Sequence, residues 1–129
     1  MTTFLLDSHT VLWFVDGNPL LPLPLRAIIE DKSQERWISF ATAWELGIKI
    51  GLRKLKIQTS LDVYLEEHML SRGIKMLPIT MPHIMQMSGL PLHHRDPFDR
   101  LLIAQALHEE MTLLSVDENF DAYGVKRVW

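Results

Sequence analysis

Short apolar segments alternate with longer amphipathic ones along this chain, and this alternation restricts the possible folds most. The apolar segments have the length of buried strands and cover residues 4–6, 37–39, 75–79 and 112–116, with 126–128 as a short fifth candidate. Segments with helical spacing separate them. Such an alternation predicts an α/β domain in which helices cover a mainly parallel central sheet.

The segments between the strand candidates place their apolar residues at helical intervals. Ser60 is a candidate N-cap for the helix that follows it, and Gly73 is expected to end that helix. Residues 89–97 contain two prolines and a pair of histidines, which is typical of a polar loop. Predicted helices cover residues 11–15, 22–31, 41–52, 61–69, 84–87 and 98–109.

The composition indicates a single soluble domain over residues 1–129. The chain is 47% hydrophobic and 22% charged, which is ordinary globular usage. It has no cysteine, so disulfides and thiolate metal sites are excluded. The first residues lack a basic segment and Asp7 interrupts the apolar stretch, so we expect no signal peptide. No apolar run is long enough to span a bilayer, and we expect a cytoplasmic protein with no membrane partner.

The formal net charge is −3, the opposite of what a broad nucleic-acid-binding surface usually carries. Two interpretations remain open. Either the chain does not bind nucleic acid, or some of its carboxylates hold a cation while the basic residues act locally.

Several acidic residues are predicted to meet at one edge of the sheet. Asp7 directly follows the first strand candidate, and Asp117 directly follows the fourth. Asp96 and Asp99 lie at the start of the helix that leads into that fourth strand. Ligands of parallel sheets bind beyond the carboxyl ends of the strands. Clustered carboxylates repel one another unless a hard cation such as Mg²⁺ or Mn²⁺ lies between them.

Each of these acids also has a purely structural interpretation. Asp7, Asp99 and Asp117 lie near predicted helix starts, where Asp commonly caps free amides. Glu45 lies on a polar stripe of its helix, four residues before Lys49, which is the spacing of a surface ion pair. Position alone therefore indicates an acidic edge without assigning a ligand set.

Four motifs, in order, resemble those of the PIN-domain ribonucleases. FLLDSHTVLWF, beginning at Phe4, resembles the opening motif, and SFATAWELGIKIGLRKL, beginning at Ser39, the second. HHRDPFDRLLIAQAL, beginning at His93, resembles the third motif of one VapC branch, and TLLSVDENFDAYG, ending at Gly124, the fourth. The matches cover almost the whole chain. They imply a single PIN domain, with a PIN-like three-layer α/β/α fold around a mainly parallel sheet.

Carried over position by position, the resemblance implies a catalytic metal site for Mg²⁺ or Mn²⁺. The family's third acid precedes the L-I-A-x-A run, the position that Asp99 holds here, so Asp99 is preferred to Asp96. Asp96 is then expected to be the helix N-cap, with Pro97 at the first helical position, or a supporting group. The implied ligands are Asp7, Glu45, Asp99 and Asp117.

Other residues receive supporting roles. Ser8 matches the small hydroxyl residue after the first acid, and Asn119 is a further candidate near Asp117. His93 and His94 are candidates for a metal-binding or general-base role, but the preferred interpretation is that they are loop residues near the mouth of the site. Candidate contacts to RNA phosphates are the basic residues Lys49, Arg53, Arg95 and Arg100.

The resemblance also implies activity and partners. PIN-domain ribonucleases of the VapC type are metal-dependent endoribonucleases that act as toxins of type II toxin–antitoxin systems. A VapB-like antitoxin and a homodimer are therefore expected. The implied antitoxin groove maps to the helices around Ile48, Leu52, Leu55, Tyr64 and Leu65, for which core packing is the alternative.

Competing functions are a catalytically silent PIN-like domain that acts by binding a partner, and a PIN nuclease with a non-toxin role in RNA processing. A haloacid-dehalogenase-like phosphatase would need an Asp at the position of His9. A receiver domain would need an acidic pair before the first helix, which is not evident. The presence of all four implied acids favours the nuclease.

Overall fold

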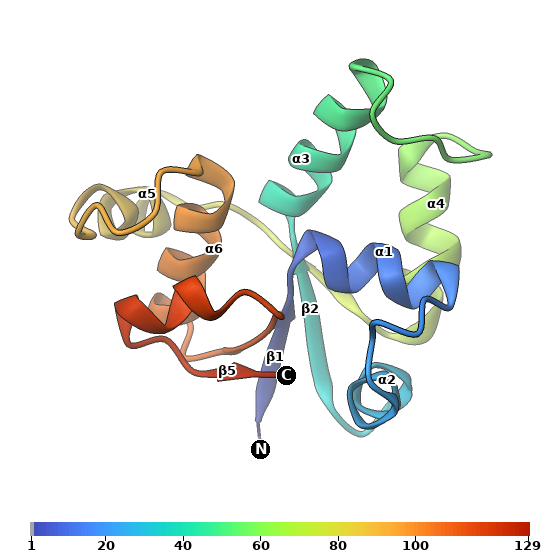
Figure 1. The fold of residues 1–129 in the computed structure, drawn as a ribbon, viewed down its shortest axis with the longest axis horizontal. Coiled ribbons are helices and arrows are strands. Elements are labelled where there is room, and N and C mark those ends of the chain that lie inside the picture. The colour runs from blue at the N-terminus through green and yellow to red at the C-terminus, as the bar shows by residue number, and fades with distance from the viewer. Residues whose placement is uncertain (1) are drawn as a thin grey trace.

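A five-stranded sheet forms the centre of the computed structural model, which describes residues 2–129 (Figure 1). The strands lie in the order β3-β2-β1-β4-β5, and every neighbouring pair is parallel. The predicted α/β class with a mainly parallel sheet is confirmed. The strands are β1 (Thr3–Leu6), β2 (Glu35–Ser39), β3 (Lys75–Leu77), β4 (Thr112–Leu114) and β5 (Arg127–Val128).

Helices cover both faces of the sheet. In Figure 1, α1, α2 and α4 lie to one side of β1 and β2, and α5 and α6 lie to the other. Two short 3-10 helices, η1 and η2, complete the connections. The helical elements are α1 (Ser8–Asp16), α2 (Leu23–Glu30), α3 (Phe40–Gly51), α4 (Leu61–His68), η1 (Leu70–Arg72), α5 (Met81–Ser88), α6 (Pro97–His108) and η2 (Glu118–Tyr123).

The alternation of side chains along β1 divides the core into two parts. Phe4 and Leu6 belong to the cluster that contains Val11 and Phe14 of α1, whereas Leu5 packs with residues of α6. Successive strand residues point to opposite faces, so one buried strand serves both layers. The three-layer α/β/α arrangement follows from this double burial.

The order of the strands creates a switch point between β1 and β4. The chain starts in the middle of the sheet, proceeds outward through β2 to β3, and then returns to the other side of β1 for β4 and β5. Leu6 of β1 pairs with Leu114 of β4, so these two strands end side by side. In α/β sheets the crevice outside such a switch point is where ligands bind.

Two strands are shorter than the sequence predicts. β3 ends at Leu77 rather than at residue 79, because Pro78 has no N–H to donate to the ladder. β4 ends at Leu114, so Asp117 lies two residues beyond Ser115 instead of directly after the strand. Asp117 instead caps η2, an element that the apolar pattern did not predict.

No helix within residues 2–129 has both the length and the apolar character needed to cross a bilayer.

Candidate metal centre

The four acids expected to bind metal line one cavity of about 240 Å³ at the carboxyl edge of the sheet. They come from four separate elements: the end of β1, the middle of α3, the start of α6 and the loop after β4. The cavity is lined by Asp7, Ser8, His9, Glu45, Lys49, Asp96, Asp99, Val116, Asp117 and Phe120.

Asp7 lies between the end of β1 and the start of α1, and it is 5% exposed. Its Oδ1 accepts the backbone N–H of Thr10 at 2.9 Å and lies 2.6 Å from the Thr10 hydroxyl. That hydroxyl also lies 2.8 Å from the carbonyl oxygen of Leu114, which ties the acid to the adjacent strand. Asp7 is therefore a helix cap through Oδ1 and still has Oδ2 for the cavity.

Glu45 reaches the cavity from α3. Ser39 begins this helix, since its side chain accepts the N–H of Ala41 at 2.9 Å. The Glu45 side chain is only 13% exposed, and its Oε2 lies 3.2 Å from Nζ of Lys49. The ion pair anticipated from the i,i+4 spacing is thus present, and both of its members line the cavity.

Asp96 and Asp99 have different positions at the start of α6. Asp96 is the N-cap, with its Oδ1 accepting from the N–H groups of Phe98 at 2.8 Å and Asp99 at 3.2 Å, and Pro97 opens the helix, as predicted. Asp99, one turn into the helix, has no capping contact and presents its side chain beside Asp117 and His94.

Asp117 is fixed by short-range contacts after β4. Its N–H donates to Oγ of Ser115 at 3.1 Å, and its Oδ1 accepts the N–H of Asn119 at 3.0 Å. Its Oδ2 faces Nε2 of His94 at 3.5 Å. As with Asp7, one oxygen caps a helical turn, but here the other oxygen faces an imidazole.

Burial raises the pKa of Asp99 from its ordinary 3.8 to about 7, and the charge of Asp96 adds to this effect. Glu45 and Asp117 raise the pKa further, whereas His94 lowers it. A carboxyl group whose pKa is raised by burial and by neighbouring carboxylates lies in a site that favours a cation. Clustered carboxylates are the donors that Mg²⁺ and Mn²⁺ take, so the residues present fit such an ion.

His94 is the site residue whose contacts the sequence did not reveal. It lies in the loop before α6, as expected, and its Nε2 lies 3.2 Å from Oδ2 of Asp99, so this loop residue contacts one of the implied ligands directly. Potential ligand atoms of His94, Asp99 and Asp117 all lie within 4.8 Å of one another. The sequence signal was the histidine immediately before the R-D-P-F-D run.

The supporting residues are placed unequally. Ser8 is buried and lines the cavity, whereas the Asp7 contacts come from Thr10, which an Asp N-cap followed three residues later by a hydroxyl side chain would have indicated. Asn119 supplies a backbone N–H to Asp117, and its exposed side chain does not line the cavity.

The four basic candidates for RNA contact also differ. Lys49 alone among them lines the cavity, and Arg53 and Arg95 are exposed outside it. Arg100 is directed into its own loop, with Nη1 donating to the carbonyl oxygen of Pro91 at 2.9 Å and Nη2 to that of Met87 at 3.1 Å. These contacts engage the Arg100 donors in holding the loop before α6.

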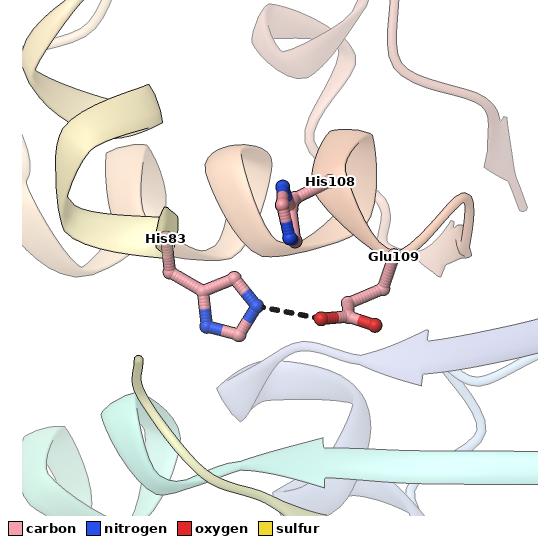
Figure 2. Close-up of side chains that lie close together, drawn as sticks. All are labelled: His83, His108 and Glu109. Atoms are coloured by element: carbon pink, nitrogen blue, oxygen red, sulfur yellow. Dashed lines mark hydrogen bonds and ion pairs between the residues drawn. The ribbon is translucent and has the colours of Figure 1, made fainter. Parts of the chain in front are cut away.

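A second His–Glu group, His83, His108 and Glu109, lies outside the cavity (Figure 2). His83 is 1% exposed, its Nε2 is 2.9 Å from Oε1 of Glu109, and its Nδ1 accepts the N–H of Thr80 at 3.1 Å. Because Nδ1 is an acceptor, Nε2 carries the proton and offers no lone pair to a metal. The ring instead links the start of α5 to the end of α6.

Comparison with known proteins supports the fold. The family model of the PIN domain matches residues 4–126. A chain of VapBC2 from Rickettsia felis, crystallised with a promoter DNA fragment, is 17% identical with a TM-score of 0.75, covering 98% of each chain. A chain of DNA-bound VapBC from Salmonella typhimurium is 18% identical with a TM-score of 0.73, covering 99% of this chain and 98% of that one.

A chain of FitAcB from Neisseria gonorrhoeae is 23% identical with a TM-score of 0.64, covering 98% of this chain and 97% of that one. A search of curated proteins finds no match to the chain. The family model spans all four motifs, from the opening strand to the segment after η2. The resemblance inferred from those motifs is confirmed: this chain belongs to the PIN domain family.

Proposed function

We propose that this chain is a Mg²⁺- or Mn²⁺-dependent endoribonuclease that acts in the cytoplasm as the VapC-type toxin of a toxin–antitoxin pair. The observation that supports it most is the convergence of Asp7, Glu45, Asp99 and Asp117 on one cavity. Members of the PIN family are nucleases, and this cavity lies at the switch point of a parallel sheet, where ligands bind.

The residues of the chain have separable tasks in this reaction. Asp7, Glu45, Asp99 and Asp117 would hold the cation. When bound, the ion supplies an activated water and stabilises the charge that develops on the phosphate oxygens. Lys49, the basic candidate that lines the cavity, is placed to offset the charge of an incoming RNA phosphate.

The test is cleavage of structured RNA by the purified chain with Mg²⁺ or Mn²⁺. We expect cleavage that EDTA abolishes, and a loss of at least about 100-fold in rate for Asp7→Asn and for Asp99→Asn, the scale on which removing one charge-stabilising group acts. Asp62→Asn, which removes an exposed carboxylate of α4, is the matched control and should cleave normally.

The outcomes distinguish the competing functions. Cleavage that survives Asp7→Asn and Asp99→Asn would contradict the assigned site. A chain that cleaves no RNA but binds a partner tightly would be the catalytically silent domain. A cleaving chain whose expression does not arrest growth, and which no partner inhibits, would be an RNA-processing nuclease without a toxin role.

The proposed antitoxin has a groove to occupy. A hollow of about 450 Å³ lies between α1, α4 and the segment that joins α3 to α4. Leu55 and Tyr64 line it, as the sequence led us to expect, together with Leu12 and Val15 of α1. Of the other expected residues, Leu65 is buried in the core, and Ile48 and Leu52 are exposed.

We expect the antitoxin to place apolar side chains of a helix in this groove, the usual way in which an amphipathic helix binds. Leu55→Glu should weaken the complex, because it puts a charge into an apolar contact. Leu23→Glu, on the exposed side of α2, is the control. Titration of each variant with the product of an adjacent small gene, measured by calorimetry, tests the groove. Equal affinities for the two variants would contradict it.

We also propose a homodimer, formed at an apolar cavity of about 290 Å³ between α3, α5 and the start of α6. Trp44, which is 59% exposed, and Phe98 meet there edge to face, with ring centroids 4.9 Å apart. Exposed aromatic side chains around an apolar hollow are typical of interfaces. Sedimentation of Trp44→Glu should show a monomer, with Leu23→Glu remaining dimeric; a wild-type monomer would contradict the proposal.

A further inference from the structure

We propose that His94 is a positioning residue that bridges Asp99 and Asp117 from outside the metal cavity and so holds these two carboxylates in place for the ion. This inference rests on the proposed metal-dependent nuclease. It concerns a residue outside the four family acids, and it follows from how the loop before α6 is built.

The first observation is the location of the imidazole. Nε2 of His94 lies 3.2 Å from Oδ2 of Asp99 and 3.5 Å from Oδ2 of Asp117. Both carboxylates line the cavity, but His94 does not. A single ring atom therefore bridges one oxygen of each of the two acids.

The second observation fixes the tautomer. Nδ1 of His94 accepts the backbone N–H of Asp96 at 3.3 Å. A neutral imidazole that accepts at Nδ1 carries its proton on Nε2. His94 therefore directs a hydrogen, and not a lone pair, toward the two carboxylates. This makes it a group that orients the ligands, and it argues against direct coordination of a metal.

The third observation is that the chain holds His94 in place from several sides. Its N–H donates to the hydroxyl of Tyr123 at 2.7 Å, and its carbonyl oxygen accepts from Nη1 of Arg100 at 3.3 Å. Its ring lies 6.0 Å from the ring of the buried Phe120. The Arg100 guanidinium also donates to carbonyl oxygens of the same loop and of the last turn of α5. This loop is therefore braced against α6 and η2 with the imidazole pointing at the acids.

The expected consequence concerns metal affinity. Groups that hydrogen-bond metal ligands from outside fix their orientation, and removing one typically weakens metal binding by about 10- to 100-fold. Without His94, the carboxylates of Asp99 and Asp117 would separate under their mutual repulsion. The ion would then have to order them again at a cost in affinity.

The experiment is calorimetric titration of the purified chain with Mg²⁺, with no RNA present. His94→Ala should raise the Kd by about 10- to 100-fold. His94→Gln, whose amide can place an N–H near the position of Nε2, should recover part of the loss. His93→Ala is the matched control, because the exposed His93 packs on Tyr123 and contacts neither acid, and it should bind as the wild type does.

Tyr123→Phe supplies a variant that leaves the imidazole intact. It removes the hydroxyl that anchors the His94 backbone, so a smaller rise in Kd is expected, of about 3-fold, less than for the loss of an orienting group itself. Circular dichroism of each metal-free variant accompanies the titration. If His94→Ala does not fold, the comparison of Tyr123→Phe and His94→Gln with the wild type decides the question.

Three results would overturn the inference. Unchanged or tighter Mg²⁺ binding by folded His94→Ala would mean that the imidazole is idle or competes with the ion. A ¹⁴N coupling to bound Mn²⁺ that disappears in His94→Ala, measured by electron paramagnetic resonance, would make His94 a direct ligand. A wild-type chain that binds neither ion would overturn the proposed function itself, whereas the first two results would leave that function standing.

Discussion

Asp99 is the carboxyl group of the site whose protonation changes near neutral pH. Its pKa of about 7 comes mainly from burial and from the neighbouring charge of Asp96. An ion that binds Asp99 below this pH must first displace a proton. The acidity of one side chain therefore connects folding, metal binding and activity.

The first prediction concerns stability without metal. Because the folded-state pKa of Asp99 lies above its unfolded value, its stabilising effect is fully present below about pH 4 and is lost as pH rises through 7. Asp99→Asn lacks this loss. In EDTA, the free energy of unfolding of Asp99→Asn, measured by urea denaturation, should exceed that of the wild type by an amount that grows between about pH 4 and 7. This difference should then level off, on the order of 4 kcal/mol at most. A gap that does not vary with pH would contradict the assignment.

The second prediction concerns Mg²⁺ affinity. The Kd of the wild type should rise by up to about 10-fold for each unit by which the pH falls below 7, and change little above pH 7, because one proton leaves as the ion binds. Calorimetry across this range, in buffers of different ionisation enthalpy, measures both the Kd and the released proton. A Kd that is flat from about pH 5.5 to 8 would show that Asp99 is ionised in the free chain.

At the residue scale, the sequence predicted the four implied ligands, which all line the cavity, and the Asp96 cap. It treated two roles as alternatives, however, that the structure combines. Capping and cavity lining were alternatives for Asp7 and Asp117, yet each residue does both, with Oδ1 on a backbone amide. His94 was beyond reach, because its place depends on Tyr123 and Arg100, which lie far from it in sequence or act through loop carbonyls.

At the scale of elements, a buried network of polar side chains joins α3, α5 and α6. Gln105 of α6 accepts from the Ser39 hydroxyl, and its amide donates to the carbonyl oxygen of Pro78 at 3.3 Å. The same amide lies 3.4 Å from Nδ1 of His83, which contacts Glu109 in turn (Figure 2). Ser39 is also the N-cap of α3, the helix that carries Glu45, so this polar network helps to fix the position of α3 at the site.

The third prediction tests this buried hydrogen-bond network. Gln105→Leu keeps the approximate volume and leaves the Ser39 hydroxyl and the Pro78 carbonyl without their partner. We expect a loss of about 1–3 kcal/mol in the free energy of unfolding per group left unsatisfied. Urea denaturation measures it, with Gln58→Leu at an exposed position as the control, expected within about 0.5 kcal/mol of the wild type. Equal stability of the two variants would show that the contacts contribute nothing.

Elements were predictable where periodicity decides them. The helices at 22–31, 41–52 and 98–109 closely match α2, α3 and α6, because each has a long apolar stripe. The short elements were not. η2 depends on the Asp117 cap and on Phe120, which is buried against the other face of the sheet, and neither gives a local helical pattern.

At the scale of the whole molecule, the metal site and the fold should stabilise each other. The four acids are brought together only when β1 and β4 have paired, so an ion that binds them binds the folded chain alone. Mass action then stabilises the fold by about 2.7 kcal/mol when the ion is at about 100 times its Kd.

The fourth prediction follows from this linkage. Mg²⁺ at about 100 times its Kd should raise the Tm of the wild type by about 10 °C, because a stabilisation of about 2.7 kcal/mol is divided by an unfolding entropy of about 2.1 cal/mol/K per residue, and EDTA should reverse the shift. Asp7→Asn should show a much smaller shift, and Asp62→Asn the full one. Differential scanning calorimetry is the measurement, and a shift of equal size in Asp7→Asn would place the ion elsewhere.

The sequence predicted the fold class but not the order of the strands in the sheet. Alternating apolar and amphipathic segments suffice for a parallel sheet with helices on both faces. The return of the chain to the far side of β1 rests on the pairing of Leu6 with Leu114, a contact between residues that no local pattern connects. The motif resemblance implied three layers and a mainly parallel sheet, and the order of the strands comes from the structure.

The double use of the Asp7 and Asp117 carboxylates has a practical consequence. Asparagine at either position keeps an oxygen that can cap the following turn while removing the charge that holds an ion. A chain with both replacements should therefore be harmless to its host yet native in shape. If the proposed function holds, such an inert copy, produced in quantity and cross-linked in living cells, would retain the RNA that the active nuclease cleaves.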